Sequence, residues 1–509
     1  MNFCKKHLEV INIAEKFYIT TAIPYVNASP HIGFALELIQ TDVIARFNRL
    51  LGKDVFFLTG TDENAQKNVL AAEKAGMTAK ELVDKNAELF IDLTKKLCIS
   101  NNDFIRTTDK KRHWKGVEKL WKLCEKNGDI YKKKYSGYYC EGCEAFVTEK
   151  DLVDGLCPEH LKPPEKIVEE NYFFRLTRYE RKLLEIIETE KLKIIPEARK
   201  NEVLSFIKNG LEDFSISRPT ERMKGWGIPV PGDETQTIYV WFDALANYIT
   251  ALGFGRNEKK FKKYWPADMH VIGKGIVRFH AVYWPAMLLS AGLPLPKSIF
   301  VHGYVTSGGQ KMSKSLGNII DPFEMIEKYG IDQLRYYLMR DVPVFSDGDF
   351  SEKNLVERVN NELVSKISNL SYRVTSFIEK NFDGKIPKSK KEKMDVGEKE
   401  IQKYLNLMSQ HKLNEALMVA VNFADEINKY FQEEKPWETV KSDVERCKRT
   451  LKTSVELTKN LWLMLYPFIP QSAEKALKLI GVKKIRHTSF KKRLSGKVKA
   501  EMIFKFLNK

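Results

Sequence analysis

Long apolar runs are missing from this sequence of 509 residues, and cysteine is scarce in it. No hydrophobic stretch approaches the length of about 20 residues that a membrane-spanning helix needs, so no membrane segment is predicted. The first sixteen residues carry Glu9 and Glu15 and lack an apolar core, so no targeting peptide is expected. The seven cysteines are odd in number and unevenly placed, which is untypical of a secreted disulfide framework and favours a cytoplasmic location.

The size and the charge of the chain indicate how many domains it has and what kind of partner it binds. A length of 509 residues is too great for one ordinary domain and predicts roughly three or four. A hydrophobic content of 43% is enough for sizeable cores. The formal net charge of +17 indicates a polyanionic partner, either nucleic acid or an acidic membrane surface. A general enrichment in lysine is the alternative explanation of this charge.

The beginning of the chain alternates between strand and helix signals. Residues 17–21 and residues 55–58 are apolar and rich in β-formers, which predicts two buried strands. Between them, apolar side chains at spacings of three and four predict a helix over residues 32–50, with Gly52 just past its end. This order is typical of one half of a Rossmann-like, doubly wound sheet.

Later strand signals predict that the sheet is interrupted and then resumes. These signals lie at residues 237–241, 269–272 and 298–302, and the Cys-rich residues 117–227 before them are interpreted as an insertion. After Asp349 the chain has few Gly and Pro residues and is expected to be helical to its end. The predicted fold class is therefore α/β plus all-α, with a split Rossmann-like domain, an insertion and a C-terminal helical bundle.

Two short motifs far apart in the sequence are predicted to act on one phosphate-bearing ligand. The first, Pro30 to Phe34, places His31 and Gly33 at the start of the predicted helix, where backbone N–H groups and the helix dipole favour an anion. The second, Lys311 to Ser315, is flanked by glycines and presents Lys311 and Lys314, which suit charge developing on phosphoryl oxygens. The alternatives are an ordinary loop histidine and a basic surface loop.

Three of the cysteines and one histidine form a metal-binding pattern. Cys140 and Cys143 are separated by two residues, and Cys157 and His160 repeat that spacing after thirteen residues. Three thiolates and one imidazole suit a closed, tetrahedral structural zinc site. A redox pair of Cys140 and Cys143 is the alternative, but it leaves the other two residues without a role.

At these motifs the chain resembles the class I aminoacyl-tRNA synthetases, and among them those for methionine. The similarity runs from about Lys16 to beyond Trp437 and includes the segments at residues 20–27, 57–63, 239–244, 272–274, 279–280 and 284–287. It implies activation of L-methionine by ATP with Mg²⁺, and transfer of methionine to tRNA(Met). The implied catalytic residues are His31, Lys311 and Lys314, and the implied ATP-binding residues are His31, Gly33, Gly273, Lys274, Lys311 and Lys314.

The resemblance also implies a methionine site, in which Asp62 holds the ammonium group. The other implied methionine-binding residues are Ala22, Ile23, Tyr25, Trp241, Ala244, Tyr248, Ile276, His280 and Trp284. Aromatic rings around a polarizable sulfur are chemically reasonable here. The chain departs from the family pattern at three places: Phe34 replaces a second histidine, Asn64-Ala65 replaces His-Gly, and Gly275 replaces an aspartate near the ribose.

The C-terminal region resembles the anticodon-binding bundle of the same family. Asn369, Arg373 and Trp437 stand where the family binds unpaired anticodon bases, a kind of recognition that suits single-stranded loops. The expected domains are residues 1–116 and 228–305 (catalytic), 117–227 (zinc-containing insertion), 306–358 (lysine-loop region) and 359–509 (anticodon-binding), in a monomer. A free adenylyltransferase or another synthetase, and a non-catalytic tRNA-binding relative, are the alternatives.

Overall fold

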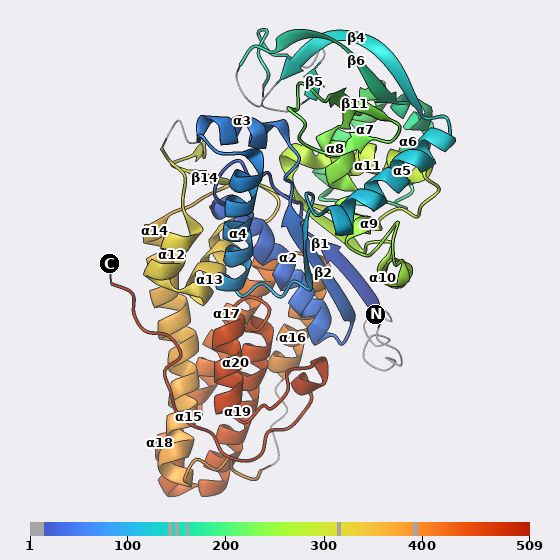
Figure 1. Ribbon diagram of the computed structural model, residues 1–509. Coiled ribbons are helices and arrows are strands. Elements are labelled where there is room, and N and C mark those ends of the chain that lie inside the picture. Colours follow the sequence, from blue (N-terminus) through green and yellow to red (C-terminus); the bar gives the residue numbers. More distant parts are fainter. Residues whose placement is uncertain are drawn as a thin grey trace.

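The structure, a computed structural model, is an elongated body with three regions (Figure 1). It describes residues 15–140, 145–147, 152–158, 162–312, 317–389 and 395–508. In the view of Figure 1, the parallel sheet lies in the middle, an antiparallel region is at the top, and a bundle of helices extends to the bottom.

The central sheet has six parallel strands in the order β3–β2–β1–β12–β13–β7. From β1, the chain order runs outwards through β2 and β3 on one side and through β12 and β13 on the other. Doubly wound sheets bind ligands at such a switch point, outside the carboxyl ends of the strands. The strands are β1 (Lys16–Thr20), β2 (Asp54–Thr61), β3 (Asp103–Arg106), β7 (Lys193–Ile195), β12 (Met269–Gly273) and β13 (Ser298–His302).

Helices cover both faces of this sheet because successive strand residues point to opposite sides. Ile19, Phe57 and Val271 pack in one core with α2 and α4, whereas Tyr18 and Ile272 pack in a second core with α5 and α11. The helices of this region are α2 (Ile32–Leu50), α3 (Gln66–Lys74), α4 (Ala79–Lys96), α5 (Lys115–Lys126), α10 (Lys259–Tyr264) and α11 (Trp284–Ser290).

The predicted helix over residues 32–50 and the strands near residues 17, 55, 269 and 298 are confirmed. Gly52 follows the end of α2 with φ of 92°, a left-handed conformation that glycine adopts without strain. The strand expected at residues 237–241 is wrong as a strand of the parallel sheet. β11 (Asp233–Ile238) instead pairs antiparallel with β9 (Ser217–Pro219) and β10 (Pro229–Val230).

The chain then enters α8 (Val240–Leu245) and α9 (Asn247–Thr250), so Trp241 lies on a helix rather than on a strand. A short apolar run of this kind does not by itself distinguish a strand from a buried helix. The parallel sheet resumes only at β12.

The region between α5 and β9 contains a long antiparallel hairpin. β4 (Ile130–Cys140) and β6 (Glu165–Phe174) pair along their length, and β5 (Ala145–Val147) and β8 (Phe214–Ser215) flank them. Two helices follow the hairpin, α6 (Glu180–Glu188) and α7 (Glu197–Lys208). Between them, β7 joins the edge of the parallel sheet, so part of residues 117–227 belongs to the core sheet.

A small unit connects the sheet to the helical bundle. It consists of β14 (Val305–Ser307), β15 (Gln310–Lys311) and β16 (Gly348–Asp349), with α12 (Pro322–Tyr329), α13 (Ile331–Asp341) and α14 (Glu352–Arg358). The hairpin of β14 and β15 leads directly into the lysine-rich motif.

The C-terminal part of the chain, from Val359 onwards, is a helical bundle whose final segment is not helical. Its helices are a π-helix η7 (Val359–Ser368), α15 (Asn369–Phe382), α16 (Asp395–Ser409), α17 (Leu413–Glu433), α18 (Pro436–Ser442), α19 (Val444–Leu465) and α20 (Pro470–Leu479). After α20, the only helical turn of the described residues is the 3₁₀ turn His487–Phe490, so the expectation of helix to the end is wrong here. The buried Lys459 of α19 donates to the carbonyl of Lys492 at 2.7 Å, which holds this segment in an extended form.

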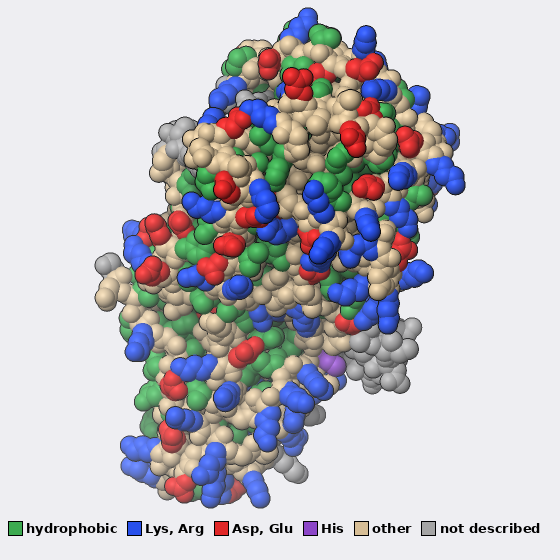
Figure 2. Space-filling model, viewed as in Figure 1, with side chains coloured by type: hydrophobic (Ala, Val, Ile, Leu, Met, Phe, Trp, Pro, Cys, Tyr) green, Lys and Arg blue, Asp and Glu red, His purple; other side chains and the backbone are tan. Residues whose placement is uncertain are grey.

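No helix among the described residues is long and apolar enough to cross a membrane. Figure 2 shows Lys and Arg side chains over the whole visible face, with several gathered at the lower end, over the helical bundle.

Candidate active site

The switch point of the sheet lies between β1 and β12, which pair through Thr20 and His270. Beyond their carboxyl ends, the chain continues on one side into the loop that leads to α2, and on the other into a 3₁₀ turn, Lys274–Ile276. The predicted ATP-binding residues lie on these two connections or at their ends: His31 precedes α2, Gly33 is in its first turn, Gly273 ends β12 and Lys274 begins the 3₁₀ turn. The sheet therefore brings together residues from two distant parts of the sequence.

His31 is the N-cap of α2, and its ring is oriented by the helix backbone. Its Nδ1 accepts a hydrogen bond of 3.0 Å from the N–H of Gly33. The proton of the neutral imidazole must therefore be on Nε2, which is left to donate to an anion. The surrounding protein removes water from around the His31 ring, and this desolvation lowers the pKa of His31, which favours the neutral form. A Cβ at position 33 would lie 2.8 Å from the His31 ring, so only glycine permits this arrangement.

The lysine-rich motif meets the start of α2, although the two are about 280 positions apart in the chain. The Ile32 N–H donates to the Ile320 carbonyl at 3.1 Å, and the Met312 methyl lies 3.9 Å from the Cβ position of Gly33. Lys311 is exposed, with its ammonium 5.4 Å from the centre of the Tyr304 ring. Lys314 lies outside the described residues. Lys311 and Met312, the described residues of the second motif, therefore lie at the same end of the sheet as His31.

Tyr304 explains how the structure accommodates glycine at position 275. A Cβ at this position would lie only 2.1 Å from the Tyr304 hydroxyl oxygen, so the phenol occupies the space of a side chain there. Lys274 lies 4.8 Å from the centre of the same ring and forms a 2.7 Å ion pair with Asp347. Burial would raise the pKa of Asp347, but Lys274 and the hydrogen bond from the Tyr304 N–H together outweigh it, so the pKa is lowered.

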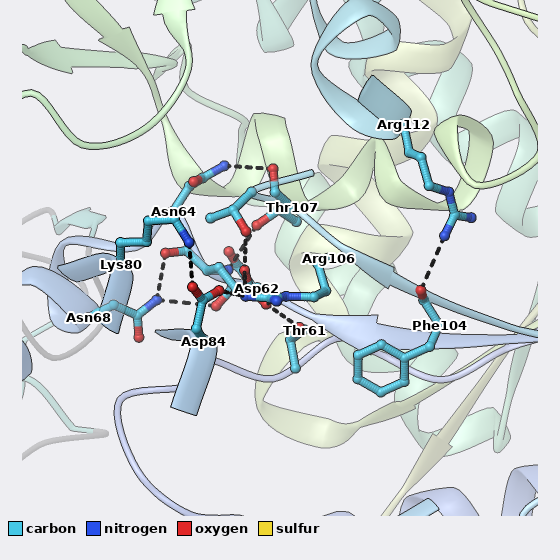
Figure 3. A network of polar contacts seen from close by, with 12 residues as sticks. Thr61, Asp62, Asn64, Asn68, Lys80, Asp84, Phe104, Arg106, Thr107 and Arg112 are labelled. Atoms are coloured by element: carbon cyan, nitrogen blue, oxygen red, sulfur yellow. Dashed lines mark hydrogen bonds and ion pairs between the residues drawn. The ribbon is translucent and has the colours of Figure 1, made fainter. Parts of the chain in front are cut away.

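The turn that carries Asp62 is held by a dense polar network (Figure 3). Arg106 forms two hydrogen bonds with the fully buried Glu63 carboxylate, at 2.7 and 3.0 Å. The N–H of Glu63 donates to Thr107 at 2.8 Å, and the Asn68 amide donates to the carbonyls of Asp62 and Glu63 at 3.2 and 2.9 Å. Asp62 itself is 2% exposed. Such a network fixes the backbone of Asp62 relative to the sheet.

Sequence reasoning did not identify Arg106, Thr107 or Asn68 as supports of this turn. The only signal was residue type, since an arginine at the end of a strand is a plausible ion-pair partner for a buried glutamate.

The predicted methionine-binding aromatic residues come together on α8, α9 and the segment around residue 280. Trp241 stacks on Phe279 with ring centroids 3.8 Å apart, and its ring meets His280 edge-on at 6.2 Å. Tyr248 contacts the rings of Trp284 and His270, at 6.1 and 4.1 Å between centroids. Phe279 and His270 were not among the predicted residues.

His280 is a neutral, oriented histidine. Its Nδ1 lies 3.0 Å from the carbonyl of Ile276, which can only accept, so this nitrogen carries the proton. Its Nε2 then accepts from the Tyr248 hydroxyl at 2.8 Å. Burial lowers the pKa of His280 to about 4, so the ring is uncharged at neutral pH. A neutral imidazole suits a site for a thioether.

Ala22, Ile23, Tyr25 and Ala244, which were also predicted to bind methionine, are buried or half-buried. Ala22 follows β1 and donates its N–H to Glu37 at 2.8 Å, and Ile23 is half-buried against the same core as Tyr248. Tyr25 packs beside Trp241 in a separate small cluster. Ala244 is buried, and its carbonyl accepts from Asn247 at 2.6 Å.

Phe34 has a structural role, because it is buried and packs edge-on against Phe90 of α4 at 5.3 Å. A buried polar pair joins α2 to the end of β13. The Glu37 carboxylate of α2 accepts from Ala22 and also bonds His302, at the end of β13, at 2.9 Å. Both side chains are buried, and neither was predicted.

The predicted zinc site lies partly outside the described residues. Cys140, at the end of β4, and Cys157 are described and buried, whereas Cys143 and His160 are not described. Within the described part of the chain, no group of three or more His, Cys, Asp or Glu side chains is placed to hold a metal. Cys140 pairs with Ala145 of β5, and Cys157 follows the bridge between Val153 and Leu156. Buried thiols fit the donor set of a structural zinc site.

The predicted anticodon-binding residues lie in the helical bundle. Asn369 and Arg373 are both on α15, and the Arg373 guanidinium is 5.4 Å from the centre of the Phe431 ring. Phe431 in turn contacts Trp437 at 6.3 Å between centroids. Trp437 is 39% exposed, which is high for a tryptophan.

Comparisons with known proteins agree with this geometry. A family profile described as "tRNA synthetases class I (M)" matches residues 17–166 and 161–375, and one for the "Anticodon binding domain of methionyl tRNA ligase" matches residues 383–505. The "Methionine--tRNA ligase" of Brucella suis is 47% identical over 92% of both chains. That of Thermotoga maritima is 46% identical, over 92% of this chain and 75% of its own length.

A solved structure gives the same result. The chain superimposes on Mycobacterium tuberculosis methionyl-tRNA synthetase in complex with methionyl-adenylate with a TM-score of 0.91 and 40% identity, covering 96% of this chain and 99% of that one. On these similarities, the chain belongs to the methionyl-tRNA synthetase family of the class I aminoacyl-tRNA synthetases.

Proposed function

We propose that this chain joins L-methionine to tRNA(Met) in two steps at the crevice beyond β1 and β12. A carboxylate oxygen of methionine attacks the α-phosphorus of ATP, and the bond to the departing pyrophosphate breaks. The 3′-terminal adenosine of tRNA(Met) then attacks the carbonyl carbon of methionyl-adenylate through a ribose hydroxyl, and AMP leaves. No side chain needs to act as a nucleophile, so catalysis depends on positioning and electrostatics.

The meeting of the two motifs is the observation that carries this proposal. The hydrogen bond from Ile32 to Ile320 and the approach of Met312 to Gly33 bring the described residues on either side of residues 313–316 to the N-terminus of α2. Neutral His31 directs an N–H donor outwards at the same helix end. This combination offers donors and cations to a polyphosphate in the place where a doubly wound sheet binds nucleotides.

The ATP site is proposed to consist of six residues with distinct tasks. His31 donates to a phosphate oxygen, Gly33 and Gly273 permit close approach of the backbone, and Lys274, Lys311 and Lys314 balance the charge that grows on pyrophosphate. Mg²⁺ bound to the ATP phosphates would neutralise part of that charge.

The methionine site is proposed to lie between Asp62 and the aromatic residues of α8 and the segment around residue 280. Asp62 binds the ammonium group in a charge-assisted contact. The side chain is bound by Ala22, Ile23, Tyr25, Trp241, Ala244, Tyr248, Ile276, His280 and Trp284. Neutral His280 and Tyr248 bond to each other, which leaves rings rather than charges to face the thioether.

A structural zinc ion is proposed for Cys140, Cys143, Cys157 and His160, which would cross-link the two loops of the hairpin. Elemental analysis of protein purified without chelators is expected to give about one zinc per chain. A content near zero, in protein that is folded and active, would contradict this assignment.

The helical bundle is proposed to bind the anticodon through Asn369, Arg373 and Trp437. The proposed domains are residues 1–116 with 228–305, 117–227, 306–358 and 359–509, and the proposed state is a cytoplasmic monomer. Aminoacylation with methionine and tRNA(Met) tests this function. Trp437→Ala is expected to raise the KM for tRNA while methionine-dependent ATP–pyrophosphate exchange is retained, because the base-stacking surface is lost and the activation site is not.

A variant of the lysine motif tests the activation site. Lys314→Ala is expected to nearly abolish exchange in a folded protein, and full exchange would contradict the role given to this lysine. A wild-type chain that binds tRNA but never exchanges pyrophosphate would be a non-catalytic relative.

A further inference from the structure

The turn that carries Asp62 is joined directly to the helix that carries Trp241. The Asn64 amide donates to the Asp243 carboxylate of α8 at 2.7 Å and to the carbonyl of Thr107 at 3.2 Å. Asn64 is two residues after Asp62, and Asp243 is two residues after Trp241. This contact therefore connects the turn of Asp62 with the helix of Trp241, and the proposed function places methionine between these two elements.

Two further hydrogen bonds, one between Asp243 and His113 and one between His113 and Thr250, hold Asp243 in place. The other oxygen of Asp243 lies 2.5 Å from His113 Nε2, and His113 Nδ1 lies 2.7 Å from the Thr250 hydroxyl of α9. Asn64 is 3% exposed, and Asp243, His113 and Thr250 are fully buried. Because Asp243 is bonded through both oxygens and is shielded from water, α8 has little freedom to shift relative to the turn.

Ala65 makes the apolar part of the same junction. It is fully buried and packs in one small cluster with Tyr239 and Val240, and the half-buried Tyr25 and Trp241 pack against this cluster. The two residues of the turn thus contact α8 in complementary ways, Asn64 through hydrogen bonding and Ala65 through close packing.

We propose that Asn64 and Ala65 are positioning residues that set the separation between Asp62 and the Trp241 wall, and that this separation selects the length of the amino-acid side chain. Asp62 binds the ammonium group, so the distance from it to the aromatic wall determines how long a side chain fits. This inference rests on the proposed function. A single methylene in an apolar pocket changes kcat/KM by about 10–200-fold, so a small shift of α8 is sufficient to alter selection.

The test is a pair of variants at position 64 in ATP–pyrophosphate exchange. Asn64→Ala removes the donor to Asp243, and Asn64→Ser keeps a shorter donor if the alanine variant does not fold. For Asn64→Ala we expect the KM for methionine to rise about tenfold or more. The KM for ATP should stay within about twofold. The preference for methionine over ethionine, which is one methylene longer, should decrease, and Asn64→Ser should lie between Asn64→Ala and the wild type.

Asn414→Ala is the matched control. The Asn414 amide of α17 donates to the carbonyls of Met339 and Val342 at 2.7 and 2.9 Å and accepts from the Val344 N–H at 3.0 Å. Its loss therefore removes three hydrogen bonds at a site away from the methionine-binding residues. This variant should lower the melting temperature without changing the KM for methionine or the preference over ethionine.

The proposal is overturned if Asn64→Ala lowers the melting temperature as Asn414→Ala does, but leaves the KM for methionine and the preference for methionine over ethionine within twofold of the wild type. Methionine-dependent exchange by the wild-type chain is measured in the same series. Its absence would contradict the proposed function itself, so the two failures are distinguishable.

Discussion

Arg335 of α13 joins three regions of the molecule and offers the clearest prediction about its stability. The side chain is fully buried and donates to the Asp42 carboxylate of α2 at 2.8 Å. It also donates to the carbonyl of Leu97, after α4, at 3.0 Å, and to those of Phe468 and Pro467, between α19 and α20, at 2.8 and 3.1 Å. Replacement by methionine keeps an unbranched stem, lacks the guanidinium group and removes every one of these bonds.

The expected loss of stability depends on the buried groups that remain without Arg335. Asp42 keeps Arg46 at 2.7 Å and the Ser100 N–H at 2.8 Å, so its charge is not isolated. Burial would raise the pKa of Asp42, but Arg46 and Arg335 outweigh it and the pKa is lowered. Removing one partner of a buried ion pair costs about 3–5 kcal/mol. The carbonyls of Leu97, Phe468 and Pro467 also lose a donor. Because they lie next to the ion pair, the separate costs do not simply add. We expect the free energy of unfolding to decrease by about 3–5 kcal/mol in total.

Equilibrium urea unfolding, followed by circular dichroism, measures this free energy. Lys328→Met is the control, because Lys328 pairs with Glu352 on the surface and its loss should not change the free energy of unfolding measurably. A decrease of less than about 1 kcal/mol for Arg335→Met would refute the reasoning, since the buried bonds would then contribute little.

Three further predictions concern the site. Lys311→Ala should lower the rate of exchange by about 10²-fold, because one cation at the departing pyrophosphate is lost; an unchanged rate would exclude that role. Arg106→Met should raise the KM for methionine more than that for ATP, because the buried Glu63 carboxylate next to Asp62 loses its partner, and equal changes would contradict the assignment. Burial lowers the pKa of His280 to about 4, from about 6.5 in the unfolded chain, so the unfolded state binds more protons between these values. The free energy of unfolding should therefore fall from about pH 6.5 to pH 4, by about 1.4 kcal/mol per pH unit for this group, and His280→Gln should flatten the slope; an equal slope would contradict this source.

The strands and helices that line the crevice were predictable where their apolar patterns are long. The helix that begins after His31 has a periodic apolar face over five turns, and its glycine stop is unambiguous. Residues 237–241 were not predictable in this way, because a short apolar run fits a strand and a buried helix equally well. The extended segment after α20 has no local signal, since its carbonyls are bound by lysines of α19 that lie far away in the sequence.

The groups at the nucleotide end of the site could be inferred from their motifs, but the supports of the site could not. Arg106 and Glu63 are 43 positions apart, and Arg335 and Asp42 are 293 apart. Nothing in the local sequence of either residue indicates its partner. Tyr304 is a similar case, because its contact with the Gly275 position arises only when β13 and β12 lie side by side.

Methionine-dependent ATP–pyrophosphate exchange by the purified chain tests the central claim most directly. Leucine, isoleucine, valine and cysteine serve as controls, because an aromatic-lined site anchored at Asp62 should distinguish them from a longer thioether. The account predicts rapid exchange with methionine and little with the other four. Exchange with none of the amino acids, in folded protein, would contradict it.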